Sequence, residues 1–224
     1  SDSIPLEYIK QIPGMTGVVT AVYDVPVGEV WSMEKIMELK KDVTNANLEM
    51  EVIESVPVHE DIKMGLTTRE KYIENYKQNI RNLAKAGVKV ICYNFMPVFD
   101  WTRSNLDYKL EDGSTALVYY KSEIEKMDPR NGDLNLPGWD ASYKKDELNA
   151  VLEKYKSVSE EDLWNNLKYF LEQIIPVAEE VKIKMAIHPD DPPWPIFGLP
   201  RIITNEENLD RFLKLYESEY NGLT

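Results

Sequence analysis

Apolar runs of strand length alternate along this chain with segments of helical spacing. Buried strands are predicted over residues 17–24, 48–58, 88–95 and 183–188. Helices are predicted over residues 31–43, 68–86, 144–155, 159–181 and 206–216. Strands that alternate with helices form a parallel sheet with the helices packed outside it. The order of these segments therefore predicts an α/β fold.

Residues from about 96 to 140 do not fit this alternation and predict a long insertion. Asp112-Gly113 separates two β-prone runs and predicts a hairpin turn, while Asn131-Gly132 and Pro137-Gly138 are further turn signals. Long loops inside a compact fold are usually binding loops or lids. We therefore expect the insertion to serve function.

Two parallel architectures fit the order of the elements. A doubly wound sheet that binds a nucleotide carries a glycine-rich phosphate loop after a strand, and no such fingerprint follows any predicted strand. A complete (β/α)₈ barrel has eight strands in about 250 residues. If this chain is a barrel, the four predicted strands make up about its first half, in one domain over residues 1–224.

Charge and composition narrow the class of partner and the compartment. The net charge is −13, which argues against binding to nucleic acid or to an anionic membrane surface. No apolar stretch approaches the ~20 residues of a spanning helix, and no signal peptide opens the sequence. The single cysteine, Cys92, leaves no internal disulfide to form, so a cytoplasmic location is expected.

Three polar residues follow predicted strands directly or closely. His188 ends the last strand and is a candidate metal ligand or proton carrier, since side chains at the C-terminal ends of barrel strands are commonly catalytic. It could equally cap the strand and bond a carbonyl. Asn94 ends the third strand, where a turn-forming role is the alternative. His59 follows the second strand at the corresponding position.

Polar and aromatic residues in the loops could contact a substrate. In the loop after the third strand, Arg103 can bind a carboxylate, Asp100 can bond sugar hydroxyls and Trp101 can pack on a sugar ring. An Asp–Arg surface pair with Trp101 anchoring the loop is the alternative. Arg201 follows His188 in the next loop, where pairing with a loop carboxylate is the simpler role. Cys92 lies mid-strand and is expected in the core.

Several longer motifs resemble the D-mannonate dehydratase family of hexuronate degradation. The resemblance runs over essentially the whole chain, and its motifs are residues 28–31, 54–55, 58–60, 92–103, 112–116, 188–194 and 197–201. The most distinctive are Cys92-Tyr93-Asn94-Phe95-Met96-Pro97-Val98-Phe99-Asp100-Trp101-Thr102-Arg103 and His188-Pro189-Asp190-Asp191-Pro192-Pro193-Trp194.

The resemblance implies a TIM barrel of xylose-isomerase-like type, of which this chain holds part. It implies a hydro-lyase that removes water from D-mannonate, in glucuronate breakdown, to give 2-dehydro-3-deoxy-D-gluconate. It also implies a divalent ion, usually Mn²⁺ with Fe²⁺ or another ion possible, held by a histidine that matches His188. A cysteine, a second histidine and an aspartate further along complete that ligand set, beyond Thr224. A homo-oligomer, such as a dimer, is expected.

Two other functions stay open on the sequence alone. The chain could belong to another metal-dependent barrel enzyme, such as a sugar isomerase or an endonuclease relative, although its negative charge disfavours DNA. It could also be a non-catalytic binding or assembly module, with the edge of a half-barrel covered by a partner.

Overall fold

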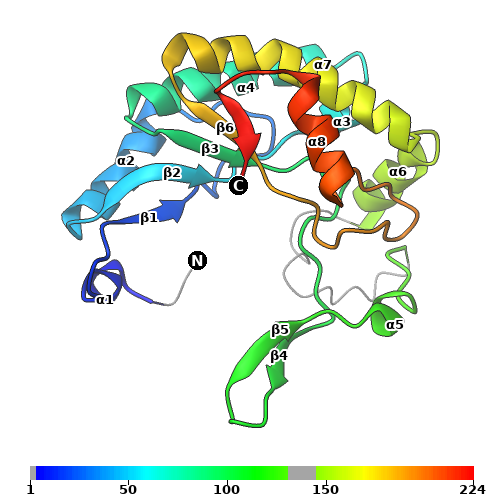
Figure 1. Ribbon diagram of the computed structural model, residues 1–224, viewed down its shortest axis with the longest axis horizontal. Helices are drawn as coiled ribbons and strands as arrows, with labels where there is room; N and C mark the ends of the chain where they lie inside the picture. The colour runs from blue at the N-terminus through cyan, green and yellow to red at the C-terminus, as the bar shows by residue number, and fades with distance from the viewer. Residues whose placement is uncertain (1–3, 131–144) are drawn as a thin grey trace. The chain divides into compact units, whose positions relative to one another are not determined.

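A five-stranded, wholly parallel sheet forms the centre of the first of two compact units. The computed structural model describes residues 4–130 and 145–224 (Figure 1). The first unit comprises Ser1–Phe95, Asn166–His188 and Arg211–Thr224. Its strands, in spatial order, are β1 (Gly17–Thr20), β2 (Glu49–Glu54), β3 (Val90–Tyr93), β6 (Lys184–Ile187) and β7 (Asn221–Leu223).

This strand order follows the order of the chain without a reversal. A doubly wound sheet reverses its order at a switch point, whereas a (β/α)₈ barrel adds each new strand beside the last. Helices α2 (Met33–Asn45), α4 (Arg69–Lys85) and α7 (Glu160–Val181, from Asn166 onward in this unit) cover one face of the sheet (Figure 1). The sheet is therefore part of a (β/α)₈ barrel, as the sequence predicts.

The two faces of the sheet differ in burial because side chains alternate along each strand. Ile53, Ile91 and Met185 are register partners on the face toward the helices, and each is at most 1% exposed. On the opposite face Val19 pairs in register with Val52 and is 55% exposed. The helix-facing side is therefore the core. The other side is only partly exposed, since Val19 is open to solvent whereas Cys92 and Ala186 are 4% and 7% exposed.

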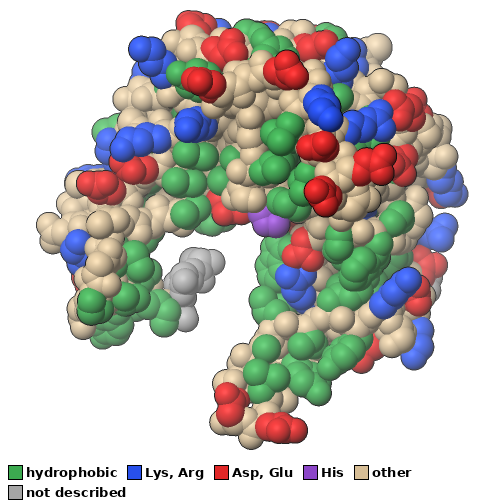
Figure 2. Space-filling model, viewed as in Figure 1, with side chains coloured by type: hydrophobic (Ala, Val, Ile, Leu, Met, Phe, Trp, Pro, Cys, Tyr) green, Lys and Arg blue, Asp and Glu red, His purple; other side chains and the backbone are tan. Residues whose placement is uncertain are grey.

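The second unit contains the insertion and comprises Met96–Asn165 and Pro189–Asp210. It holds the antiparallel hairpin of β4 (Asn105–Lys109) and β5 (Thr115–Val118), with α5 (Lys121–Ile124) and α6 (Lys145–Tyr155). The turn at Asp112-Gly113 is confirmed, with Gly113 at a φ of 85°. Hydrophobic side chains gather over the hairpin (Figure 2). The turn signals at Asn131-Gly132 and Pro137-Gly138 lie outside the described residues.

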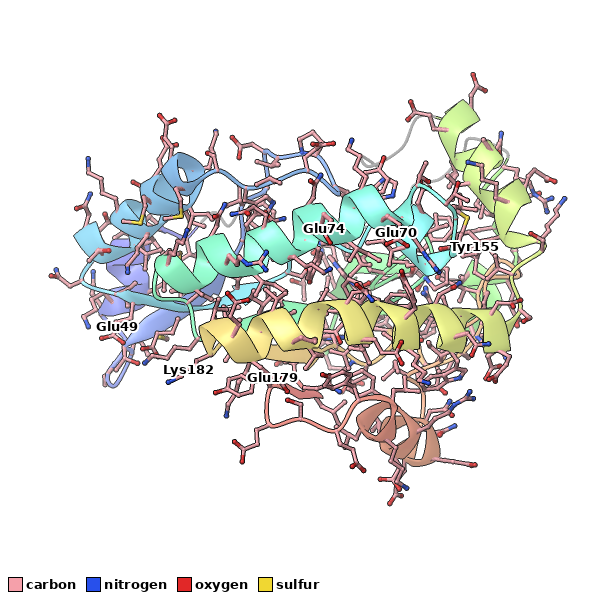
Figure 3. The ribbon with its side chains drawn as sticks, turned by 90° about the horizontal axis from the view of Figure 1, so that it is seen from above. Glu49, Glu70, Glu74, Tyr155, Glu179 and Lys182 are labelled. Carbon is pink, nitrogen blue, oxygen red and sulfur yellow. The ribbon has the colours of Figure 1, made fainter. Side chains whose placement is uncertain are left out.

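Helices α4 and α7 lie side by side on the sheet of the first unit (Figure 3). Phe170 of α7 joins them, because its ring contacts that of Tyr76 in α4 at a centroid distance of 5.0 Å. The same ring lies 5.9 Å from those of Tyr93 and Phe95 at the end of β3. One aromatic cluster therefore fixes both helices to the end of the sheet that carries the candidate residues.

The predicted strands and helices are confirmed, with differences at their ends and in their number. Strand β2 ends at Glu54 although Val56 and Val58 are at most 3% exposed, because these residues enter the core from a loop. The sheet has a fifth strand, β7, so the prediction of four strands was wrong. Three short helices, α1 (Leu6–Lys10), α3 (Glu60–Lys63) and α5, were not predicted, and α8 (Glu206–Leu215) ends one residue early.

The single-domain assignment stays a prediction. Within the described residues no helix combines the length and apolar character needed to cross a membrane.

Candidate functional site

The C-terminal edge of the sheet carries Asn94 and His188 on neighbouring strands. Tyr93 and Ile187, the last residues of β3 and β6, are register partners. The backbone N–H of His188 donates to the carbonyl of Tyr93 over 2.7 Å, which extends the ladder by one step. The sequence therefore placed both residues correctly, at the same edge of the sheet.

A row of register partners lies one step further into the sheet. Glu54, Cys92, Ala186 and Gly222 follow one another across four strands. Cys92 is 4% exposed, as the sequence predicts for a core residue, and burial raises the pKa of its thiol. Glu54 is exposed and adds a carboxylate to this row, which the reasoning from composition and spacing did not single out.

His59 caps helix α3 and stacks on Tyr72. Its Nδ1 accepts from the backbone N–H of Asp61 at 3.1 Å, and the two rings lie 3.5 Å apart at 11°. Burial lowers the pKa of His59, against the opposing pull of Asp61 and Glu60. A neutral imidazole whose Nδ1 accepts a hydrogen bond carries its proton on Nε2. Nε2 is thus the atom with which His59 could donate to a ligand.

The described residues do not make up a metal site by themselves. No group of three or more His, Cys, Asp or Glu side chains in residues 4–130 and 145–224 is placed to hold a metal ion. Catalytic metal sites usually have three or more protein ligands. The role of His188 as a metal ligand therefore stays a prediction.

In the second unit, Arg103 binds a carboxylate of its own chain. Its Nη1 and Nη2 donate to Oδ1 and Oδ2 of Asp191 at 3.0 and 2.8 Å, and Nη1 also donates to the carbonyl of Thr102 at 2.9 Å. The guanidinium lies 5.5 Å from the ring centroid of Trp101, which is 37% exposed. The sequence raised the alternative of an Asp–Arg pair, and the partner is Asp191 across the two loops. Asp100 is half-buried.

Arg201 and Asp190 are buried in the same unit. Arg201 is 2% exposed and its Nη2 donates to the carbonyl of Phe99. Asp190 is 4% exposed, and its Oδ2 accepts from the backbone N–H groups of Ile202 and Ile203 at 2.7 and 3.1 Å. Asp190 was not among the predicted site residues.

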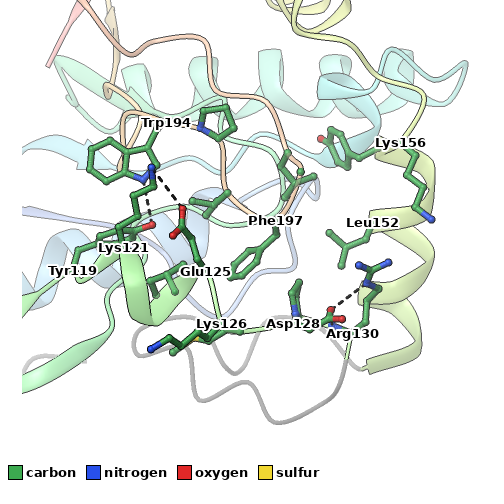
Figure 4. A pocket seen from close by; sticks show the side chains of 18 of the residues that line it. Tyr119, Lys121, Glu125, Lys126, Asp128, Arg130, Leu152, Lys156, Trp194 and Phe197 are labelled. Carbon is green, nitrogen blue, oxygen red and sulfur yellow. Dashed lines mark hydrogen bonds and ion pairs between the residues drawn. The ribbon is translucent and has the colours of Figure 1, made fainter.

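A cavity of about 550 Å³ lies within the second unit. Its wall carries the aromatic rings of Tyr119, Trp194 and Phe197, and the indole N–H of Trp194 donates to the hydroxyl of Tyr119 at 3.2 Å (Figure 4). Charged side chains at its border pair with one another, as Arg130 does with Asp128 at 3.1 Å. None of the predicted site residues lines it, so this cavity is not the site that the sequence indicated.

The whole sequence matches one protein family. A family model described as D-mannonate dehydratase (UxuA) matches residues 1–224. The chain belongs to the D-mannonate dehydratase family.

Members of the D-mannonate dehydratase family with curated names match this chain over its full length. Over 224 residues it is 62% identical to mannonate dehydratase 2 of Halalkalibacterium halodurans and 62% identical to a mannonate dehydratase of Streptococcus suis. It spans 65% and 61% of the lengths of these two proteins. The crystal structure of mannonate dehydratase from Streptococcus suis serotype 2 superimposes with a TM-score of 0.90 at 57% identity, over 100% of this chain and 60% of that one.

Proposed function

We propose that the protein to which these residues belong is a mannonate dehydratase. Such a hydro-lyase converts D-mannonate into 2-dehydro-3-deoxy-D-gluconate and water, in the cytoplasmic breakdown of glucuronate. The family match over residues 1–224, together with 62% identity to curated mannonate dehydratases, is the observation that carries this proposal. The parallel sheet with polar residues at its C-terminal edge supports it, because barrel enzymes act at that edge.

The proposed reaction removes a proton from the carbon next to a carboxylate, which places almost two negative charges on the resulting enediolate. A bound divalent ion would stabilise this charge as a Lewis acid. We propose Mn²⁺, with Fe²⁺ as an alternative, and His188 as the one ligand from the described residues. A neutral imidazole suits such an ion. No proton-transfer role is assigned to a residue of this chain.

For the substrate we propose contacts with Asn94, Asp100, Trp101 and His59. An amide and a carboxylate can bond sugar hydroxyls, and an indole face that is 37% exposed can pack on the apolar side of the carbon chain. His59 would donate from Nε2. For Arg103 and Arg201 the contacts favour a different role, since the first is bound bidentately to Asp191 and the second is 2% exposed.

We also propose that the protein is a homodimer whose interface includes the β4–β5 hairpin. Leu106, Tyr108, Leu110, Leu117 and Tyr120 are each at least 40% exposed. A two-stranded hairpin is marginally stable by itself, and exposed apolar patches mark interaction surfaces. Sedimentation equilibrium of the full-length protein should give twice the monomer mass, and Tyr108→Asp with Leu117→Asp should return it to the monomer mass.

The decisive experiment uses the full-length enzyme. After chelation and addition of Mn²⁺, D-mannonate should lose water to give the 2-dehydro-3-deoxy product, observed by NMR. Parallel incubations with aldoses and with abasic DNA test the isomerase and endonuclease alternatives. Turnover of an aldose or of DNA with no reaction of mannonate would overturn the proposal.

The role of His188 is tested separately by calorimetry of Mn²⁺ binding. His188→Ala should lower the affinity for Mn²⁺ by 10-fold or more, because one ligand is lost. His59→Asn, which changes the other histidine, should keep the wild-type affinity. Unchanged Mn²⁺ binding by His188→Ala would remove this residue from the metal site.

A further inference from the structure

Two loops of the second unit are joined by hydrogen bonds, and each loop contributes one arginine that donates to the other loop. The first, residues 96–103, follows β3 along the chain, and the second, residues 189–203, follows β6. Arg103 of the first loop bonds Asp191 of the second, and Arg201 of the second bonds the carbonyl of Phe99 in the first. Each loop thus supplies one guanidinium and one acceptor.

The pair of Arg103 and Asp191 is partly exposed to solvent, but its bidentate hydrogen bonding is complete. Both terminal nitrogens of Arg103 meet the two carboxylate oxygens of Asp191, with side-chain exposures of 21% and 32%. Bidentate Arg–carboxylate pairs are the strong and orientation-specific ones. The backbone N–H of Asp191 also donates to Sδ of Met96 at 3.4 Å, so the same residue contacts the first loop twice.

The Arg201 end is buried and is closed by Asp190. The backbone N–H of Asp190 donates to the carbonyl of Ile203 at 2.8 Å, and its carboxylate accepts from Ile202 and Ile203. These three bonds join the two ends of the segment 191–201. They also fix the backbone directly after Arg201. Arg201 is 2% exposed, so its side chain is enclosed by protein.

Each loop also holds one residue in a conformation that side chains with a Cβ rarely adopt. Val98 has a φ of 58° and Phe197 a φ of 53°. Such backbone conformations persist only where the surroundings over-determine them, and they gather at binding and catalytic sites. The rings of Phe99 and Phe197 contact each other at 5.1 Å, beside both strained positions. The paired loops are therefore held rigidly.

We propose that Arg103–Asp191 and Arg201–Phe99 form a reciprocal clamp whose arginines position the loops and do not bind the substrate. The clamp fixes Trp101, over whose ring the Arg103 guanidinium lies. It also fixes Asp100, which follows Phe99 and whose backbone carbonyl accepts from the hydroxyl of Thr102 at 3.1 Å. Arg103 and Arg201 are thus positioning residues for the sugar contacts. The kinetic part of this inference rests on the proposed dehydratase function.

Kinetics of the full-length enzyme with D-mannonate distinguish positioning from direct binding. For a positioning clamp, Arg103→Gln and Asp191→Asn should each lower kcat about 10-fold or more, with KM within about 3-fold of wild type. Arg103→Lys should recover little, because lysine lacks the two-pronged fork. The exchange R103D with D191R should recover part of the lost kcat. Arg130→Gln, which breaks the exposed Arg130–Asp128 pair, is the matched control and should keep both constants.

The opposite pattern would overturn the clamp. If Arg103 bound the substrate carboxylate, Arg103→Gln would raise KM by 10-fold or more, Asp191→Asn would bind substrate as well as wild type or better, and the exchange would not recover activity.

Unfolding gives a readout that needs no activity. The Arg103→Gln/Asp191→Asn double variant should melt within about 1 °C of the less stable single variant, because both changes break the same bond. Additive shifts in Tm would contradict the clamp even if the enzyme turned over mannonate. A wild type without dehydratase activity but with non-additive Tm shifts would instead refute the proposed function and leave the clamp in place.

Discussion

At the residue scale, Gly28 packs against two stacked rings of the first unit. Its φ is 86°, and a Cβ there would lie 2.6 Å from Cδ1 of Tyr72 and 2.9 Å from Cδ2 of His59. The Gly28 carbonyl also accepts from Asn75 at 2.8 Å, which fixes this close approach. The position therefore needs glycine for both its backbone conformation and its space.

Gly28→Ala should destabilise the fold by about 2–4 kcal/mol, the sum of a left-handed backbone and an overpacked contact. Gly87→Ala is the matched control, since its φ is also 86° but its Cβ would meet only the flexible Nζ of Lys40 at 3.3 Å. We expect about 1–2 kcal/mol there. Urea unfolding measures both, and equal losses would mean that the ring contact is unimportant.

His59 should make stability depend on pH. Burial lowers its pKa below the ordinary value of 6.5, so the folded state favours the neutral ring. The stabilisation is complete above that ordinary value and is lost as the pH falls through it toward the folded-state pKa. In His59→Asn, which keeps a capping side chain, the midpoint of urea unfolding should change less between pH 7 and pH 5 than in wild type. If the midpoint of urea unfolding changed as much with pH in His59→Asn as in wild type, this prediction would be refuted.

At the element scale, local signals located most helices and strands. Ser159 is a residue type favoured as an N-cap at the start of α7, and its Oγ accepts from the backbone N–H of Asp162 at 3.1 Å. Gly87 follows the end of α4 and has the left-handed φ at which helices commonly end. Strand β7 was not predicted, because Asn221–Leu223 has only three residues and no alternation of apolar and polar side chains. It forms a strand because it pairs with β6.

The candidate site was predictable only in part, for a related reason. The position of Asn94 and His188 follows from where an apolar run ends, which is local information. The partner of Arg103 is 88 residues away in sequence, so no local pattern identifies Asp191 among the many carboxylates. The burial of Arg201 and Asp190 likewise depends on contacts between the two loops.

Helix α7 should depend on Phe170 for its attachment to the sheet. Phe170→Ala would remove a fully buried ring that contacts Tyr76, Tyr93 and Phe95, and we expect a loss of about 3–5 kcal/mol in urea unfolding. Phe170→Leu should lose much less, because most of the volume stays. Glu172→Ala, on the exposed side of the same helix, should change stability by under about 0.5 kcal/mol.

At the scale of the whole molecule, the exposed part of the sheet face opposite the helices, which carries Val19, predicts what further chain would cover. In the part of the chain that the structure describes, the sheet has five strands, about three fewer than a closed barrel. The chain spans 61–65% of the length of the curated relatives it matches. We expect the additional residues of a full-length protein to supply those strands and bury the face that carries Val19.

Matched variants on the two faces of the sheet test this expectation. Val19 is 55% exposed in these 224 residues, so Val19→Ala should change their stability by under about 0.5 kcal/mol. In the full-length protein the same change should lose about 1–3 kcal/mol, because a buried side chain is truncated. Ile53→Val, on the face already covered by helices, should lose about 1 kcal/mol in both. Urea unfolding of both substitutions, each in the 224-residue chain and in the full-length protein, tests this expectation. An equal effect of Val19→Ala in both lengths would mean that the face that carries Val19 stays exposed in the full-length protein.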